Sequence, residues 1–120
     1  MKFLNSKTHS AVDYIVVIFL WLSPTLFNLS YPTSMLVYLL GAVHLALTIF
    51  TNFHFGLVKI IPLRWHGWVE LGVAIVLMAS PSLLGNYVSF GSLIDKYFLA
   101  GFGVAVLITW AVTDYSTEPK

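Results

Sequence analysis

The chain contains no cysteine among its 120 residues, which excludes disulfide bonds, cysteine-ligated metals and thiol chemistry. Charged residues are scarce as well: Asp, Glu, Lys and Arg make up 9% of the chain, against roughly a quarter in a soluble domain. The net charge of +1 indicates no basic surface for nucleic acid. Hydrophobic residues make up 58% of the whole chain, and its mean hydropathy is +0.86. This composition predicts a membrane protein whose first partner is the lipid bilayer.

Three long segments without Asp, Glu, Lys or Arg set the number of membrane spans. They cover residues 14–58, 71–94 and 97–113. A membrane-spanning helix needs about 20 largely apolar residues, so the first segment holds two helices and the others one each. We predict an all-α bundle of four transmembrane helices, near 8–28, 34–53, 65–85 and 95–115. Together they form a single transmembrane domain over residues 1–120.

The cations indicate how the helices are oriented. Of the six lysines and arginines, Lys96 alone falls on one side of the predicted bundle. The other five fall on the opposite side, namely Lys2, Lys7, Lys59, Arg64 and Lys120. Cytoplasmic loops carry an excess of Lys and Arg. The sequence therefore predicts a multi-pass protein with both termini in the cytoplasm.

The chain also repeats itself. Residues 9–26, HSAVDYIVVIFLWLSPTL, align without a gap with residues 66–83, HGWVELGVAIVLMASPSL. Repeat 1 covers about 7–56 and repeat 2 about 64–115, and TNF at 51–53 resembles TDY at 113–115 less closely. A unit of two helices starts and ends on the same side of the membrane, so its copy inserts in the same orientation. We predict two parallel tandem helical-hairpin repeats.

Each repeat begins its first helix with a histidine four residues before a carboxylate, as His9 with Asp13 and His66 with Glu70. Residues at this spacing share one helix face. Ionisable residues inside membrane spans mark functional sites by default, which makes these four our candidates for a proton- or ion-binding site. Two His and two carboxylates would also suit a divalent metal of the Zn, Mn or Fe type. The structural alternative is a pair that anchors the helix end, its acid neutralised by Lys7 or Arg64.

Other polar and small residues point to structure. The pairs Ser23-Pro24 and Ser80-Pro81 predict a kink or an end in each first helix, with the serines satisfying freed backbone groups. His44 has no matching histidine in the fourth helix, and we expect it to be a neutral core residue without an acidic partner. Small residues at four-residue spacing suit close helix contacts, namely Ala42, Ala46, Gly101 and Ala105.

The repeated two-helix units with a Ser-Pro pair late in the first helix resemble the SPW-repeat family of small bacterial membrane proteins. That family carries Ser-Pro-Trp, whereas this chain has Thr25 and Ser82 in place of the tryptophan. The resemblance covers nearly the whole chain and implies a four-helix protein of the inner, cytoplasmic membrane. It implies no activity.

Three functions are open at this point. The chain is most simply a non-enzymatic accessory or assembly subunit that joins a membrane-protein partner, or a homo-oligomeric bundle, and needs no cofactor. The alternative is a small proton or cation transporter or channel that uses the repeated His-carboxylate pairs. A metal- or quinone-dependent membrane enzyme ranks last, because the sequence has no nucleophile-base arrangement.

Overall fold

The structure is a computed structural model that describes residues 2–84 and 92–117. It contains four α-helices, α1 (Ser6–Leu26), α2 (Tyr31–Phe50), α3 (Leu63–Leu84) and α4 (Leu93–Val112), followed by a 3₁₀ turn, η1 (Tyr115–Thr117). The described residues form no strand. The prediction of an all-α, four-helix protein is confirmed, and each predicted helix boundary lies within three residues of the observed one.

Local sequence signals account for where the helices begin. The side chain of Asn5 accepts a hydrogen bond from the backbone N–H of Thr8 at 3.0 Å, which caps α1. Helix α2 has Pro32 in its first turn, where the missing N–H costs nothing. Ser92 and Asp95 form a reciprocal capping box at the start of α4. Such caps satisfy backbone N–H groups that have no partner within the helix.

Three of the described helices, α1, α2 and α4, are long and apolar enough to cross a membrane. Helix α3 is as long, with 22 residues, but carries Arg64, His66 and Glu70 in its first two turns. The molecule is 46 Å along its longest axis, which matches the ~40–45 Å of a bilayer with its headgroups. Large apolar side chains such as Ile15, Leu39 and Val76 are exposed on its sides. These features are those of a membrane protein.

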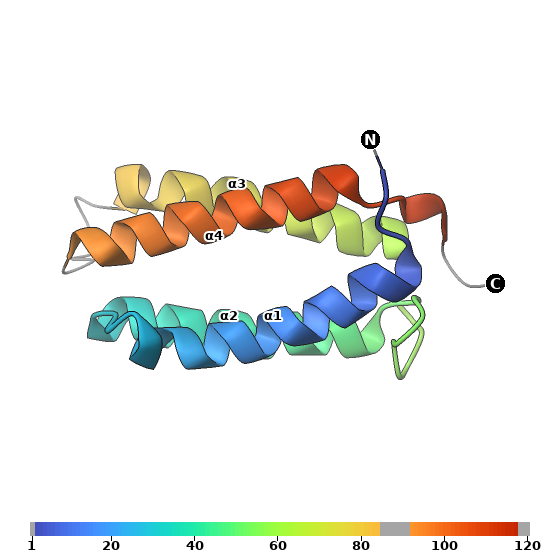
Figure 1. Ribbon diagram of the computed structural model, residues 1–120, viewed down its shortest axis with the longest axis horizontal. Coiled ribbons are helices and arrows are strands. Elements are labelled where there is room, and N and C mark those ends of the chain that lie inside the picture. The colour runs from blue at the N-terminus through green and yellow to red at the C-terminus, as the bar shows by residue number, and fades with distance from the viewer. Residues whose placement is uncertain (1, 85–91, 118–120) are drawn as a thin grey trace.

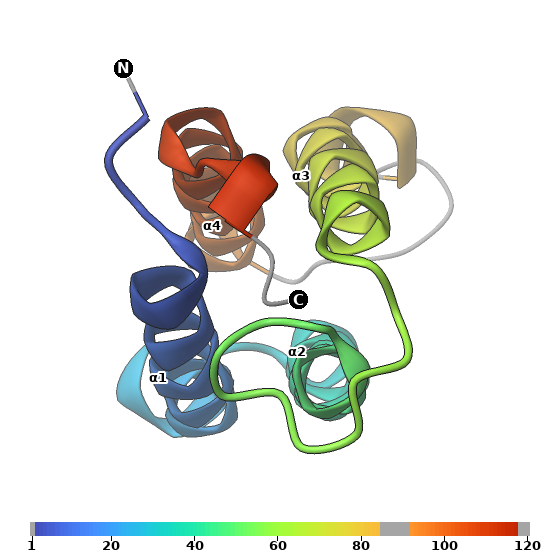
Figure 2. The same ribbon diagram turned by 90° about the vertical axis from the view of Figure 1, so that its right-hand side faces the viewer.

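The four helices stand at the corners of a square when viewed along the bundle (Figure 2). The closest packing is between α1 and α2 and between α3 and α4, so the bundle consists of two hairpins laid against each other (Figure 1). Helices α1 and α3 occupy one diagonal of the square. Both chain ends and the loop from α2 to α3 lie at one end of the bundle (Figure 1).

The bundle interior is divided into two halves. Away from the chain ends it is an apolar core of buried side chains, namely Leu20, Leu29, Val37, Leu77, Phe98 and Leu99. Near the chain ends most buried side chains are instead polar, packed beside Phe53 and Leu63, and they include His9, Asp13, Thr51, His66, Glu70 and Thr113. Because burying a polar group is costly unless it is paired, this polar half is the part of the molecule that needs an explanation.

Short backbone pairings close the polar end in two places. The N–H groups of Phe3 and Leu4 both donate to the carbonyl of Val112, at 2.9 and 3.0 Å. The N–H groups of Ile60 and Ile61 donate in the same way to the carbonyl of Phe50, at 3.1 and 2.8 Å. The segment before α1 is therefore attached to the end of α4 as the segment before α3 is attached to the end of α2.

Both prolines lie near the end of a helix, as α1 continues two residues beyond Pro24 and α3 three beyond Pro81. The hydroxyl of Ser80 donates at 2.9 Å to the carbonyl of Leu77, the group that Pro81 leaves without its helical N–H. The hydroxyl of Ser23 instead donates to the carbonyl of Phe19 at 2.6 Å.

The prediction of close helix contacts at Ala42, Ala46, Gly101 and Ala105 is wrong, because all four are exposed. The glycines that face neighbouring helices are Gly41 and Gly103. A methyl group on Gly41 would lie 2.5 Å from the Trp21 indole nitrogen, and one on Gly103 would lie 2.9 Å from the Met78 side chain. Large partner side chains, rather than other small residues, fill the space these glycines leave.

Candidate functional site

The structure brings the two His-carboxylate pairs together in the polar half of the bundle. His9 and Asp13 come from α1, and His66 and Glu70 come from α3, the helix diagonally opposite (Figure 2). Their exposed fractions are 0%, 2%, 0% and 4%. We call these four residues the centre.

Each imidazole of the centre contacts both carboxylates. His9 Nε2 lies 3.4 Å from an oxygen of Asp13 and 3.1 Å from an oxygen of Glu70. His66 Nε2 lies 3.0 Å from an oxygen of Asp13 and 3.2 Å from an oxygen of Glu70. One ligand atom from each of the four residues can be chosen so that all lie within 4.8 Å of one another.

Two threonines fix the orientation of the imidazoles. Thr113, just beyond α4, lies 2.7 Å from His9 Nδ1, and Thr51, just beyond α2, lies 2.7 Å from His66 Nδ1. Each threonine hydroxyl donates its only proton to a helix carbonyl, that of Thr109 or of Leu47, at 2.6 Å. The hydroxyl oxygen must therefore accept from the imidazole. Both histidines thus carry a proton on Nδ1 and turn Nε2 toward the carboxylates.

The 3₁₀ turn after α4 closes the centre from the end of the bundle. The Tyr115 hydroxyl donates to Glu70 Oε2 at 2.9 Å, and its ring lies 5.8 Å from the His9 ring. Burial, together with the nearby Glu70 carboxylate, holds the pKa of Tyr115 above its ordinary value. Tyr115 therefore remains a hydrogen-bond donor to Glu70 throughout the physiological pH range.

His44 also reaches the centre. Its Nε2 lies 3.5 Å from Asp13 Oδ1, so the expectation that it lacks an acidic partner is wrong. The Thr48 hydroxyl donates to the backbone carbonyl of His44 at 2.7 Å. No sequence pattern indicated the contact with Asp13, because only the packing of α2 against α1 places His44 beside Asp13.

Three buried side-chain atoms in the described part of the chain have no hydrogen-bond partner, and all three belong to this region: Asp13 Oδ2, His44 Nε2 and His66 Nε2. His66 Nε2 and Asp13 Oδ2 lie 3.0 Å apart, yet their mutual orientation is not that of a hydrogen bond. Buried polar atoms normally have a partner. Those of the centre are close together without being bonded to each other.

No lysine or arginine of the described residues forms an ion pair with the carboxylates of the centre. Every ion pair among residues 2–84 and 92–117 has a histidine as its cation, and neither Lys7 nor Arg64 contacts Asp13 or Glu70. Neutralisation of the acids by Lys7 or Arg64, one part of the structural alternative, is therefore not found among the described residues, whereas its other part, the pairing of each His with the carboxylate four residues later, is present. The centre must find its positive charge among its own groups or in a bound cation.

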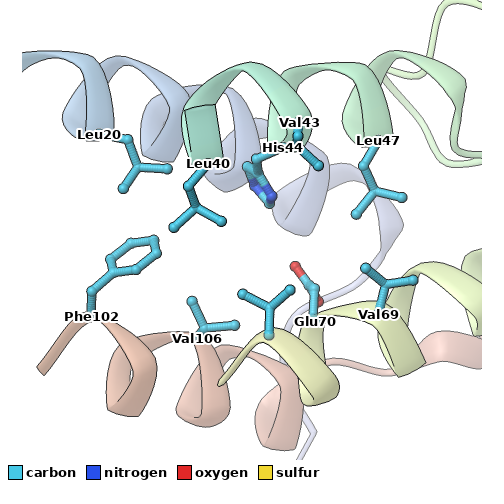
Figure 3. Close-up of a pocket in the computed structure, with 10 residues that line it drawn as sticks. Leu20, Leu40, Val43, His44, Leu47, Val69, Glu70, Phe102 and Val106 are labelled. Atoms are coloured by element: carbon cyan, nitrogen blue, oxygen red, sulfur yellow. The ribbon is translucent and has the colours of Figure 1, made fainter. Parts of the chain in front are cut away.

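Two small cavities border the centre on the side of the apolar core. One of about 40 Å³ lies between the hairpins, and Figure 3 shows His44 and Glu70 pointing into it from opposite helices. The second, of about 50 Å³, is lined by Asp13, His44, Glu70 and Thr109 among others. A cavity needs only about 10–15 Å³ of such space to hold a water molecule. Each cavity can therefore supply water to the carboxylates.

Comparison with protein-family models, with curated proteins and with solved structures finds no match for this chain. The resemblance to the SPW-repeat family stays a prediction from its Ser-Pro pairs. The chemistry of the centre must be argued from its own geometry: four buried, converging ligand atoms that can hold either protons or a cation.

Proposed function

We propose that this protein is a non-enzymatic, metal-binding protein of the inner membrane. In this proposal two parallel helical-hairpin repeats each supply one His and one carboxylate to a single divalent transition-metal ion. Zinc is the preferred candidate, followed by iron or manganese. Helix α3 crosses the membrane with the other three, and both termini face the cytoplasm. The observation that carries the proposal is the convergence of the four ligand atoms described above.

The charge of the centre supports a divalent cation. Two buried carboxylates require two positive charges, because an unpaired charge in an apolar interior is very costly. With Nδ1 protonated and hydrogen-bonded to threonine, each neutral imidazole offers the lone pair of Nε2. Two neutral imidazoles, two carboxylates and one divalent ion sum to zero charge.

The distances leave room for one ion among the four residues. Zinc binds imidazole nitrogen and carboxylate oxygen at about 2.0–2.2 Å, so two of its ligand atoms stand about 3.3–3.6 Å apart in a tetrahedral site. One oxygen of Glu70 lies 3.1 and 3.2 Å from the two Nε2 atoms, whereas His9 and His66 lie nearest to different oxygens of Asp13, at 3.4 and 3.0 Å. One ligand atom from each of the four residues lies within 4.8 Å of the others. The imidazole N–H groups bonded to Thr51 and Thr113 are the outer contacts that metal-binding histidines usually make.

The completeness of the ligand set supports a binding role rather than catalysis. Catalytic zinc sites keep one coordination position for water or substrate, whereas structural sites fill all four with protein ligands. His9, Asp13, His66 and Glu70 fill four positions. The pairing of residues between the repeats supports the same proposal, since His9 and His66 perform one task, as do Thr113 and Thr51.

The test is metal analysis together with native mass spectrometry of protein purified gently from its own membranes. We expect about one equivalent of metal per chain in the wild type and in the His54→Gln control, which changes an exposed histidine. The isosteric double variant Asp13→Asn, Glu70→Gln should retain none. Wild-type protein without metal, even after zinc is added to the purified sample, would refute the proposal. The same spectrum tests the expected accessory role, because a partner subunit adds its own mass.

A second candidate is a proton site, in which two protons replace the metal. His9 Nε2 hydrogen-bonds Glu70 Oε1 at 3.1 Å, the contact that an imidazolium makes with a carboxylate. On this hypothesis no metal is retained, and the Asp13→Asn, Glu70→Gln variant alters the pH profile of thermal stability between about pH 5 and 8. A profile that matches the wild type would remove this candidate.

A further inference from the structure

A separate cavity of about 230 Å³ opens on the outside of the bundle where α3 begins and α4 ends. We call it the vestibule, and it is lined by Lys2, Arg64, Gly67, Trp68, Trp110 and Tyr115. The start of α3 and the end of α4, which carry most of these residues, face the viewer in Figure 2. This is the level of the lipid headgroups if the bundle spans the membrane, because the apolar lengths of the helices begin just beyond it.

The titratable lining of the vestibule is cationic. Lys2 and Arg64 are both exposed, and among the described residues no carboxylate lines the cavity, although the charge of Lys2 also acts on Asp114. Arg64 forms no ion pair with any described residue, since the cation of each such pair is a histidine. An arginine guanidinium offers five donors in a planar fork that matches the oxygens of a phosphate. The vestibule therefore presents two positive charges to an anion.

Aromatic side chains complete the walls. Trp68 is 56% exposed, and Trp110 and Tyr115 are half-buried. Tryptophan and tyrosine are enriched where the apolar core of the bilayer meets the headgroups, because the ring is apolar and its N–H or O–H is polar. Gly67 makes this arrangement possible: a methyl group there would lie 2.8 Å from a ring carbon of Tyr115. The ring can lie against α3 only because that position lacks a side chain.

The first repeat does not have this combination of residues. The ungapped alignment places Ala11 opposite Trp68 and Lys59 opposite Lys2. The Lys59 ammonium is engaged instead by the backbone carbonyl of Phe53, at 2.8 Å. The vestibule thus combines a tryptophan with Arg64, which has no ion-pair partner among the described residues, and with Lys2, whose charge also acts on Asp114.

We propose that the vestibule binds the phosphate headgroup of an anionic phospholipid. Arg64 and Lys2 contact the phosphate oxygens, and the aromatic rings of Trp68 and Trp110 lie beside the glycerol and the first methylene groups of the acyl chains. Basic pockets at the cytoplasmic ends of transmembrane helices recognise anionic headgroups in this way. The proposal does not depend on metal in the centre, because none of the four centre residues lines the vestibule.

The test is native mass spectrometry of delipidated protein in an equimolar mixture of phosphatidylglycerol and phosphatidylcholine with identical acyl chains. A cation near the membrane surface contributes roughly a fivefold preference for anionic lipid. We expect the wild type to retain one phosphatidylglycerol with at least about that preference, and Arg64→Gln to lose most of it. The matched control is Lys7→Gln, which removes the cation that the alignment pairs with Arg64 but that lies outside the vestibule.

Several outcomes would overturn the proposal. They are a wild type that takes both lipids equally, a Lys7→Gln variant that loses as much preference as Arg64→Gln, and release of the lipid by millimolar inorganic phosphate, which would assign the site to free phosphate. Melting temperature and metal content should be the same in Arg64→Gln as in the wild type. If Arg64→Gln fails to fold, the double variant Trp68→Ala, Lys2→Gln takes its place and should likewise lose the preference for phosphatidylglycerol.

Discussion

Replacement by valine of Thr51 or Thr113, the two threonines that orient the imidazoles of the centre, tests the metal proposal most directly. Valine keeps the shape of threonine and removes only the hydroxyl. In Thr51→Val the Nδ1–H of His66 loses its acceptor at 2.7 Å, and in Thr113→Val the same happens to His9. A buried N–H without a partner costs about 1–3 kcal/mol. The imidazole avoids this cost by moving its proton to Nε2, which removes the lone pair that binds the metal.

The expected loss follows from that argument. Outer-shell changes of this kind typically lower metal affinity about 10–100-fold, and we expect each single variant to fall in that range. The two variants should agree within a few-fold, because the two contacts have equal lengths. The double variant should lose less than the product of the two, because the His9 and His66 rings lie 5.4 Å apart and residues in contact are not additive.

The assay is zinc competition against a fluorescent chelator in detergent, with Thr48→Val as the matched control. Thr48 is fully buried in α2, three residues before Thr51, and its hydroxyl donates to the backbone carbonyl of His44. It should keep wild-type affinity. The reasoning is refuted if Thr51→Val and Thr113→Val bind zinc as the wild type does, or if Thr48→Val loses as much as they do.

Further predictions concern protons and the closing turn. Zinc should dissociate from the wild type as the pH is lowered from 7 to 5 beside a weak chelator, because protons compete for the imidazoles and carboxylates; metal retained at pH 5 would contradict this. Gly67→Ala should lower the free energy of unfolding by about 1 kcal/mol by displacing the Tyr115 ring and its bond to Glu70. The control Gly72→Ala, where nothing lies within 4 Å of the added methyl, should not be destabilised in the same thermal melts. The folded state holds the pKa of Tyr115 above the ordinary value of about 10. The neutral phenol therefore contributes to the free energy of unfolding below about pH 10, and this contribution is lost progressively above about pH 10. Wild type should therefore lose thermal stability faster than Tyr115→Phe between pH 10 and 11, and parallel profiles would show the phenol to be unperturbed.

The sequence predicted the helices and the grouping of the centre for physical reasons that are easy to state. A span must be apolar for about 20 residues, so gaps between charges locate the helices whatever their packing. The i, i+4 spacing places His9 beside Asp13 on one helix face, and the repeat predicts the same for His66 and Glu70. The convergence of the two pairs required only that the helices meet inside the bundle.

The missed residues lie where local patterns carry no information. Thr51, Thr113 and Tyr115 follow the ends of helices, and their contacts depend on how the hairpins are laid together. A signal was present, because the match of TNF at 51–53 with TDY at 113–115 pairs Thr51 with Thr113. A polar residue repeated just after a helix is therefore as informative as one repeated within it. His44 had no such signal, since it occurs in one repeat alone.

The threonine contacts cross from one hairpin to the other, so neither hairpin holds a complete centre. His9 is oriented by Thr113 of the second hairpin, and His66 by Thr51 of the first. A single hairpin contains a histidine without the threonine that orients it, so the centre can form only once both hairpins have packed together. The hairpins differ elsewhere, as His44 on one side and Val106 on the other illustrate around the same cavities.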